Sequence, residues 1–134
     1  MNDKSKESIR IFVDWIKVKI RAHLSERHIE FNEGEIWWAA LGHNIGVEAN
    51  GKNAQFERPI LVVRKFSRDS LWGIPISTQL KSGPYYFRFK HKDVSNCLNL
   101  SQIRLCSAKR LLRRVGHFPV SDFQEVRNKV KNMV

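Results

Sequence analysis

The chain has 134 residues, with 24 Lys and Arg against 13 Asp and Glu, which gives a formal net charge of +11 and a pI of about 10.1. This length suits one domain with a core of its own and argues against a second domain. The charge favours a polyanionic partner, because binding to phosphates releases counterions. A solvated basic surface explains the charge alone equally well.

The cysteines and the N-terminus argue against secreted and membrane-spanning proteins. Cys97 and Cys106 are the only two cysteines and lie in apolar segments, so we expect reduced core thiols in a cytoplasmic protein. Residues 1–7 are polar, and charged residues interrupt the apolar stretch that follows. This pattern is typical of neither a signal peptide nor a membrane span.

The histidines do not indicate a metal site. His23 and His28 are five residues apart, and the sequence has neither a CxxC pair nor a carboxylate cluster, so we expect no metal and no cofactor. His43 lies among glycines in a loop, where a neutral imidazole could accept a proton from a ribose hydroxyl. A solvent-exposed loop histidine is the more common outcome.

The first predicted element is a helix over residues 5–26. Its apolar residues recur at a spacing of three to four and form one stripe opposite a basic face. We expect the stripe to pack on a sheet or on a second copy of the chain, and the alternative is a docking helix for an inhibitory partner. A membrane-bound helix needs more aromatic anchors than this segment offers. The stripe consists of Ile9, Phe12, Val13, Ile16, Ile20 and Leu24.

From residue 35 onward the pattern changes to that of strands. Short runs rich in β-branched and aromatic residues alternate with Gly, Ser, Asn and Lys clusters, which predicts a small antiparallel barrel. Pro59 cannot donate to a strand ladder, so it should begin its strand or lie at an edge, which leaves Arg58 at the mouth of that strand. The predicted strands are residues 35–41, 59–66, 70–77, 84–90 and 101–107.

The loop over residues 42–57 contains three glycines, and loops of this length are usually functional, so we expect it to flank the active site. After the sheet, residues 109–114 place four cations beside two leucines, which we expect to be buried while the cations face solvent or phosphate. A closing helix should begin at a capping box formed by Ser121 and Gln124.

The strand at residues 84–90 alternates between two faces. Tyr85, Phe87 and Phe89 should face the core. The opposite face suits stacking of a single-stranded base beside cations, and it is also ordinary decoration of a sheet. It carries Tyr86, Arg88 and Lys90.

Arg58 and the hydroxyl pair Ser77-Thr78 stand at the ends of two predicted strands. An arginine stays charged at neutral pH, and its planar fork suits bidentate contact with a phosphate. Beside hydroxyl and amide donors it makes a suitable site for stabilising the transition-state charge of a phosphodiester. In a chain of +11 charge, RNA is the substrate this favours.

Four short motifs occur in an order that one nuclease family shares. Together they resemble the PemK/MazF family of toxin endoribonucleases over residues 33–134, which leaves residues 1–32 as an N-terminal helical extension of a single domain. The motifs are Gly34-Glu35-Ile36-Trp37-Trp38, Gly46-Val47-Glu48, Arg58-Pro59-Ile60-Leu61-Val62 and Ser77-Thr78-Gln79.

The resemblance implies an α+β, mainly β fold, a small SH3-like antiparallel β-barrel with an added N-terminal amphipathic helix and a C-terminal helix. It implies a metal-independent endoribonuclease that cleaves single-stranded RNA, such as mRNA. The ribose 2′-OH would attack its own phosphate and leave a 2′,3′-cyclic phosphate and a 5′-OH end. DNA lacks this hydroxyl and should resist.

The resemblance also assigns roles to residues of this chain. Arg58 would stabilise the transition state and, as an alternative role, exchange a proton. Ser77 would bond a phosphate oxygen where the family commonly has threonine, with Thr78 as a possible substitute. Glu48 would orient Arg58, carry a proton or order its loop. Ser101 stands where a family strand often carries Asp, so a partner role of that Asp is not carried over. Expected RNA contacts are Thr78, Gln79, Lys81, Lys52, Arg64, Tyr86 and Arg88.

The implied partners follow from a toxin of this kind. We expect a cytoplasmic homodimer that is restrained by an acidic antitoxin and that reaches DNA only through the antitoxin complex. No membrane contact is expected. The competing hypothesis is a non-catalytic barrel module that binds RNA or protein without cutting, because small barrels serve many functions.

Overall fold

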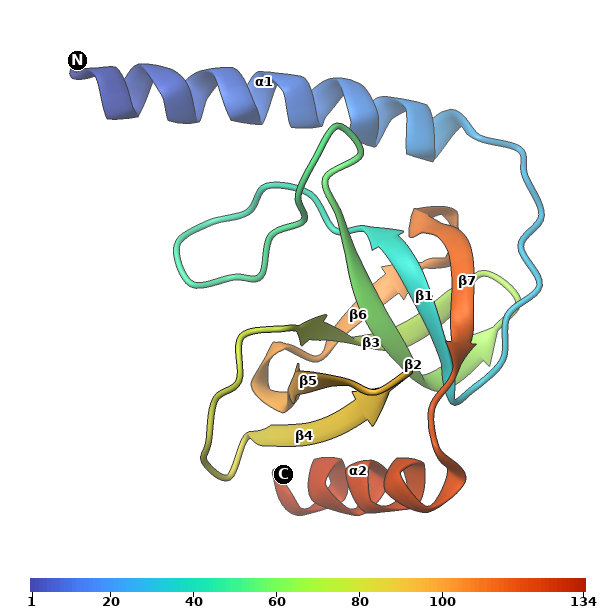
Figure 1. The fold of residues 1–134 in the computed structure, drawn as a ribbon. Helices are drawn as coiled ribbons and strands as arrows, with labels where there is room; N and C mark the ends of the chain where they lie inside the picture. Colours follow the sequence, from blue (N-terminus) through green and yellow to red (C-terminus); the bar gives the residue numbers. More distant parts are fainter.

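The computed structural model describes residues 1–134 and consists of a curved antiparallel sheet between two helices (Figure 1). The long helix α1 (Asp3–Leu24) crosses one end of the sheet, and helix α2 (Val120–Asn132) lies at the opposite end. The strands are β1 (Glu35–Ala40), β2 (Glu57–Ser67), β3 (Ser70–Ser77), β4 (Tyr86–His91), β5 (Val94–Asn99), β6 (Arg104–Ser107) and β7 (Leu111–His117), with short 3-10 helices η1 (Leu100–Gln102) and η2 (Ala108–Arg110).

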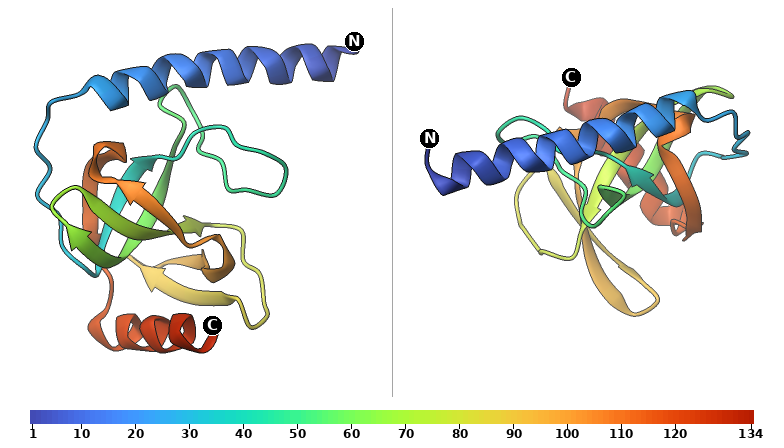
Figure 2. Two further views of the ribbon diagram at one scale, coloured as in Figure 1. Left: turned by 180° about the vertical axis from the view of Figure 1, so that it is seen from behind. Right: turned by 90° about the horizontal axis from the view of Figure 1, so that it is seen from above.

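Every strand pair is antiparallel, and the order across the sheet is β4-β5-β3-β2-β1-β7. Strand β6 pairs with the first half of β3, while β5 pairs with its last two residues. The sheet therefore curls on itself into a barrel-like shape that does not close (Figure 2). This confirms the predicted mainly β fold with a helix at each end of the chain.

Strand β2 is the centre of the core, because both of its faces are buried. Ile60 and Val62 point into a cluster with Leu71 and Leu111, whereas Leu61 belongs to a second cluster that α2 helps to cover. A strand that is buried on both faces typically has an unbroken run of apolar residues, and residues 60–63 form such a run. Each large side chain that is buried here contributes about 1.5–3 kcal/mol relative to exposure.

Strand β2 begins at Glu57, two residues before Pro59, so of the two positions predicted for Pro59 the start of the strand is wrong. Pro59 lies opposite Trp38 of β1, but pairing with β3 starts only at Ile60, opposite Pro75. Its missing N–H is therefore tolerated, and Arg58 lies within β2 just before the part that is paired on both sides.

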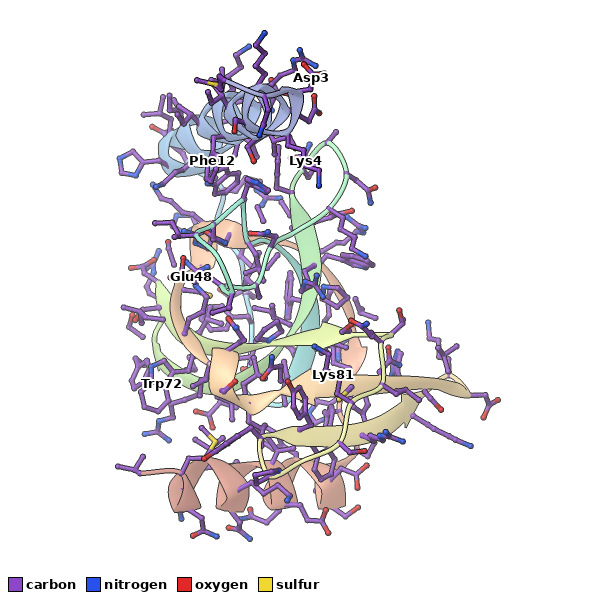
Figure 3. All side chains as sticks on the ribbon, turned by 90° about the vertical axis from the view of Figure 1, so that its left-hand side faces the viewer. Asp3, Lys4, Phe12, Glu48, Trp72 and Lys81 are labelled. Atoms are coloured by element: carbon purple, nitrogen blue, oxygen red, sulfur yellow. The ribbon has the colours of Figure 1, made fainter.

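Helix α1 forms as predicted, but the prediction that its apolar stripe packs on the sheet is wrong. All six residues of that stripe are exposed, and the buried residues of the helix are Trp15 and Val18, each 6% exposed. Trp15 packs against Phe56 and approaches Gly42 so closely that no Cβ would fit there. Trp15 and Val18 form a small cluster with Ala40 of β1, against which Phe56 of the loop and Leu112 of β7 pack, and this cluster holds the helix on the domain. Figure 3 shows α1 nearly end-on, above the loop that carries Glu48.

Three further expectations need correction. The segment at residues 109–114 does not follow the sheet but is largely strand β7, although the expected burial holds for Leu111, which is fully buried, and Leu112 is half-buried. Tyr85 is 50% exposed and is not part of the core. Helix α2 begins at Val120 after Pro119, with no side-chain cap, and Gln124 donates to Asn128, so the predicted capping box does not form.

Both cysteines are buried and form no disulfide. None of the helices is long and apolar enough to span a bilayer.

Candidate functional site

Arg58 carries a half-buried charge that no carboxylate neutralises. Its Nε donates to the main-chain oxygen of Asn50 at 2.6 Å, and its Nη1 lies 3.4 Å from the main-chain oxygen of Ile76. It takes part in none of the ion pairs of the structure. Burial lowers the pKa of the guanidinium, because desolvation disfavours its charged form. An anion bound here would offset this desolvation.

Strand β7 holds two acids of the sheet in ion pairs, and one of them, Glu57, is the neighbour of Arg58 in β2. Arg113 makes a two-pronged contact with Glu57, at 2.8 and 3.1 Å, and Arg114 bonds Glu35 at 2.8 Å. Both carboxylates are therefore occupied by cations of the neighbouring edge strand. The charge of Arg58 is left available to a ligand.

The loop between β1 and β2 holds the carbonyl that aims Arg58. Asn44 ties the loop together, because its amide donates to the main-chain oxygens of Leu41 and Ala49, and its main-chain N–H donates to the Asn50 side chain at 2.6 Å. From η1, Gln102 accepts from the N–H of Ala49 at 3.0 Å and donates to the oxygen of Val47 at 2.8 Å. These hydrogen bonds fix the part of the loop that precedes Asn50.

Ser77 ends β3 with a hydroxyl whose proton is free. Its Oγ accepts a hydrogen bond from the main-chain N–H of Gln79 at 3.0 Å, which fixes the oxygen in a short turn. Because the oxygen is the acceptor in this bond, the hydroxyl proton can be donated to a ligand.

Two clefts open beside these residues, and Arg58 and Ser77 line both of them. The first, which we call the Tyr86 cleft after a residue of its lining, has a volume of about 170 Å³. It carries the cations Arg58 and Lys81 and has no carboxylate in its lining. The Trp38 cleft, also about 170 Å³, carries Lys52 and Arg58, and its one acid, Glu57, is paired with Arg113. Both clefts therefore suit an anionic chain that passes over Arg58.

A larger cavity of about 350 Å³ lies between the segment after α1 and the hairpin of β2 and β3. Three of its cations hold that segment in place, since Arg27, Lys65 and Lys109 donate to main-chain oxygens at 2.7, 2.9 and 2.6 Å. Unlike the Tyr86 cleft, this cavity has three carboxylates in its lining, Glu26, Glu30 and Asp69, so it suits an anionic chain less well.

Residues 32–134 match the family described as PemK-like, MazF-like toxin of type II toxin-antitoxin system. The chain belongs to this toxin family. The resemblance of the sequence motifs is thereby confirmed, and helix α1 lies outside the matched region. A search of curated proteins found none that matches.

Solved structures of the family share this fold at low sequence identity. MazF from Deinococcus radiodurans superposes with a TM-score of 0.62 and 18% identity, covering 78% of this chain and 96% of that one. An endoribonuclease in complex with its cognate antitoxin, from a mycobacterial species, gives 0.60 and 13%, covering 77% and 93%. The MazE-MazF structure from D. radiodurans gives 0.57 and 16%, covering 78% and 95%.

The fold brings most of the predicted site residues of this MazF-like chain together. Arg58 and Ser77 line both clefts. The Tyr86 cleft adds Gln79, Lys81 and Tyr86, and the Trp38 cleft adds Lys52 and Thr78.

Four other candidates lie outside the two clefts. Arg64 belongs to a separate cleft with Phe66 and α2 and pairs with Glu33 at 3.6 Å. Arg88 braces the loop before β4 through the oxygen of Lys81 and the hydroxyl of Ser82. Glu48 accepts from the N–H of Ile45 at 2.9 Å, which is a contact within the loop. His43 packs on Phe12, with ring centres 4.6 Å apart.

Sequence reasoning missed several residues that build the site. Gln102 follows Ser101 in a segment that resembles a family strand, but a lone glutamine beside a short turn gives no signal of its role. Asn50 acts through its main-chain oxygen, which any residue type carries, so the sequence holds no signal for it. Trp38 was part of a family motif and appears here as a half-buried wall of the second cleft, under the guanidinium of Arg113.

Proposed function

We propose that this protein is a toxin endoribonuclease that cleaves single-stranded RNA without a metal ion. The observation that carries the proposal is the unneutralised, half-buried Arg58 beside the free hydroxyl proton of Ser77 in two acid-poor clefts. Membership of the toxin family supports it.

The reaction needs alignment and charge stabilisation. The ribose 2′-oxygen attacks the adjacent phosphorus while the bond from phosphorus to the 5′-oxygen breaks, which gives a 2′,3′-cyclic phosphate and a 5′-OH. The 2′-oxygen loses its proton, and the 5′-oxygen gains one. The free Nη donors of Arg58 would bond the non-bridging oxygens, and Ser77 would donate a further hydrogen bond as their charge grows.

The RNA would extend from the scissile phosphate into both clefts. Lys81 and Gln79 would contact flanking phosphates or base edges on one side, with Tyr86 as a stacking surface. Lys52 and Thr78 would serve on the other side. Glu48 would act by ordering the loop that presents Asn50.

The protein's partners are part of the proposal. We infer a cytoplasmic homodimer, an acidic antitoxin that blocks the clefts, and contact with DNA only through the antitoxin complex. The solved relatives support an antitoxin, since two of them are described as complexes with a cognate antitoxin or with MazE. The +11 charge suits an acidic partner.

Cleavage of single-stranded RNA in EDTA by the wild type and by Arg58→Ala tests the proposal. We expect wild-type cleavage, a cyclic phosphate at the new 3′ end, and a loss of about 10²–10³-fold in Arg58→Ala with RNA binding retained. Arg64→Ala is the matched control, because it removes an arginine from the same strand outside both clefts. Wild type that never cuts RNA in EDTA would overturn the proposal.

One observation favours the alternative of a non-catalytic module. No histidine or carboxylate lines the Tyr86 cleft, so it lacks an evident general base. A module of this kind would bind RNA with a strong dependence on salt and would leave every phosphodiester intact.

A further inference from the structure

Helix α1 has two apolar faces on nearly opposite sides. Successive residues turn by about 100° around an α-helix, which places Ile11, Trp15, Val18 and Ala22 along one side. This side faces the domain, since these four are the only residues of the helix that are not exposed. The other side is the outward stripe, which we define as Ile9, Val13, Ile16, Ile20 and Leu24.

The outward stripe has no partner within the chain. Its residues are 46–69% exposed, although the inward residues Trp15 and Val18 are 6% exposed. The family match begins at residue 32, so it does not include the outward stripe, and the solved relatives cover 77–78% of this chain. A contiguous apolar face of this kind on a well-formed helix is typical of a surface that binds another molecule.

Cations border the outward stripe on both sides. By the same helical geometry, Lys6, Arg10, Lys17 and Arg21 follow one edge, and Lys19 follows the other. Of these, only Arg10 pairs with a carboxylate, Glu7, at 2.9 Å. Glu7 and Asp14 lie further round than this basic border, and Asp3 lies on its line at the first turn of the helix.

The positions of these cations favour one kind of binding partner over the others. An antiparallel second copy of α1 would bring the edge with four cations against itself, and a parallel copy would bring it against the edge that carries Lys19. Both directions place cations together, and such like-charge contacts are destabilising. A bilayer surface is served by interfacial Trp and Tyr, but Trp15 is turned into the domain and the stripe holds neither residue. A protein helix with an apolar stripe flanked by carboxylates satisfies both the apolar face and the cations.

We infer that the outward stripe of α1 docks an acidic amphipathic helix of a protein partner. The docked pair would be a two-helix contact with Ile16 and Ile20 at its centre and with Lys17, Lys19 and Arg21 paired to carboxylates at its edges. The surface is separate from the RNA site, because no residue of the stripe lines either cleft. The inference therefore does not depend on RNA cleavage, although an antitoxin could supply the helix.

Synthetic 22-residue helical peptides provide the probes. The acidic probe carries a leucine stripe flanked by glutamates, and the basic probe has the same stripe flanked by lysines. Binding to the full chain with Arg58→Ala is measured by fluorescence anisotropy, and helix content by circular dichroism. We expect the acidic probe to bind, with an affinity that falls as salt rises, and the basic probe to bind at least about tenfold more weakly.

Two variants and one control locate the binding. Ile16→Ser with Ile20→Ser should weaken the acidic probe at least about tenfold, since the apolar centre is lost. Val94→Ser with Leu105→Ser, which changes two exposed apolar residues elsewhere, should leave binding unchanged. Lys17→Glu with Arg21→Glu should reverse the preference towards the basic probe.

Several results would overturn the inference. These are equal binding or no binding of the two probes, dimers of the free chain that the double serine variant abolishes, and stripe-dependent binding to phosphatidylserine vesicles without binding of the acidic probe. The wild-type RNA assay is scored separately. Failed probe binding with intact cleavage removes only this inference, and failed cleavage with intact probe binding removes only the proposed function.

Discussion

The guanidinium of Arg58 is oriented by the main-chain oxygen of Asn50, at 2.6 Å from Nε. A carbonyl directs the side chain through its dipole, but unlike a carboxylate it does not cancel the positive charge. The cation is therefore held in place and remains available to a phosphate. The orientation of Arg58 therefore depends on the loop that presents Asn50.

Gln102→Ala should impair cleavage although Gln102 need not touch the reacting phosphate. The side chain fixes Val47 and Ala49, next to Asn50, with bonds of 2.8 and 3.0 Å. Without them Arg58 should lose its alignment, with a fall of about tenfold in kcat and a smaller change in KM. Gln102→Glu keeps the acceptor for Ala49 and should recover part of kcat. Equal kcat in Gln102→Ala and wild type would show that the loop needs no such support.

Ser77→Ala should reduce cleavage by about 10²-fold, because it removes a donor to the charged phosphate oxygens. Ser77→Thr restores the hydroxyl and should keep most of the activity. Thr78→Ala is the comparison, since Thr78 lines only the Trp38 cleft. Single-turnover rates at saturating RNA measure all three. A larger loss in Thr78→Ala than in Ser77→Ala would move the active hydroxyl to Thr78.

Glu48→Gln should stay within a few-fold of wild type. Its Oε1 accepts from the N–H of Ile45, and a glutamine oxygen can do the same. Glu48→Ala loses the acceptor and should loosen the loop. The pH profile of kcat distinguishes the two roles of Glu48. If this carboxylate carried the proton, Glu48→Gln would lose as much kcat as Glu48→Ala, and the acidic limb of its pH profile would disappear.

Much of the barrel could be predicted, because strands β1, β2 and β3 carry strong apolar patterns. Strand β5 could not, because the polar and apolar residues of Val94-Ser95-Asn96-Cys97-Leu98-Asn99 do not alternate, and Val94 is its only β-branched residue. The turn between β4 and β5 carries no sequence signal either. Lys92 and Asp93 both have positive φ, at 50° and 64°, as in a two-residue hairpin turn that usually contains Asn-Gly.

Strand β7 and the face of α1 were missed for a different reason, which is tertiary context. The adjacent Arg113 and Arg114 look solvated in sequence, and only the fold shows that Glu57 and Glu35 receive them. In α1 the sequence periodicity predicts that the more regular apolar stripe is buried. Trp15 and Val18 are buried instead, because Gly42 leaves room for a large ring beside the loop. Sequence periodicity finds apolar faces but does not rank them.

Glu35→Gln should destabilise the fold at neutral pH. Burial alone would raise the pKa of Glu35, but hydrogen bonds from the Asn32 N–H, Trp37 and Arg114 hold it below its ordinary value of 4.5. A carboxylate with a lowered folded-state pKa stabilises the fold fully above its unfolded pKa, and this contribution is lost as the pH falls through the folded-state pKa. We expect a cost of about 1.5–3 kcal/mol at pH 7.

Urea unfolding of wild type and Glu35→Gln between pH 3 and pH 8 measures this difference. The gap in the free energy of unfolding should be constant above about pH 5 and shrink towards pH 3, where wild type also loses the charge. Glu7→Gln serves as the control, because Glu7 makes only an exposed ion pair with Arg10. A gap that widens at low pH would contradict the lowered pKa.

Gly42→Ala should release helix α1 from the domain. Gly42 has a φ of +96°, and an added Cβ would lie 2.4 Å from the Trp15 ring, so the substitution meets both backbone strain and a collision. Gly46→Ala separates these effects, since Gly46 has a φ of +54° and nothing lies within 4 Å of its added Cβ. The strain should cost each variant about 1–2 kcal/mol. Only Gly42→Ala should also speed amide exchange throughout α1, because the collision displaces Trp15. If exchange in α1 were the same in both variants, the contact between Trp15 and the loop would not be what holds the helix.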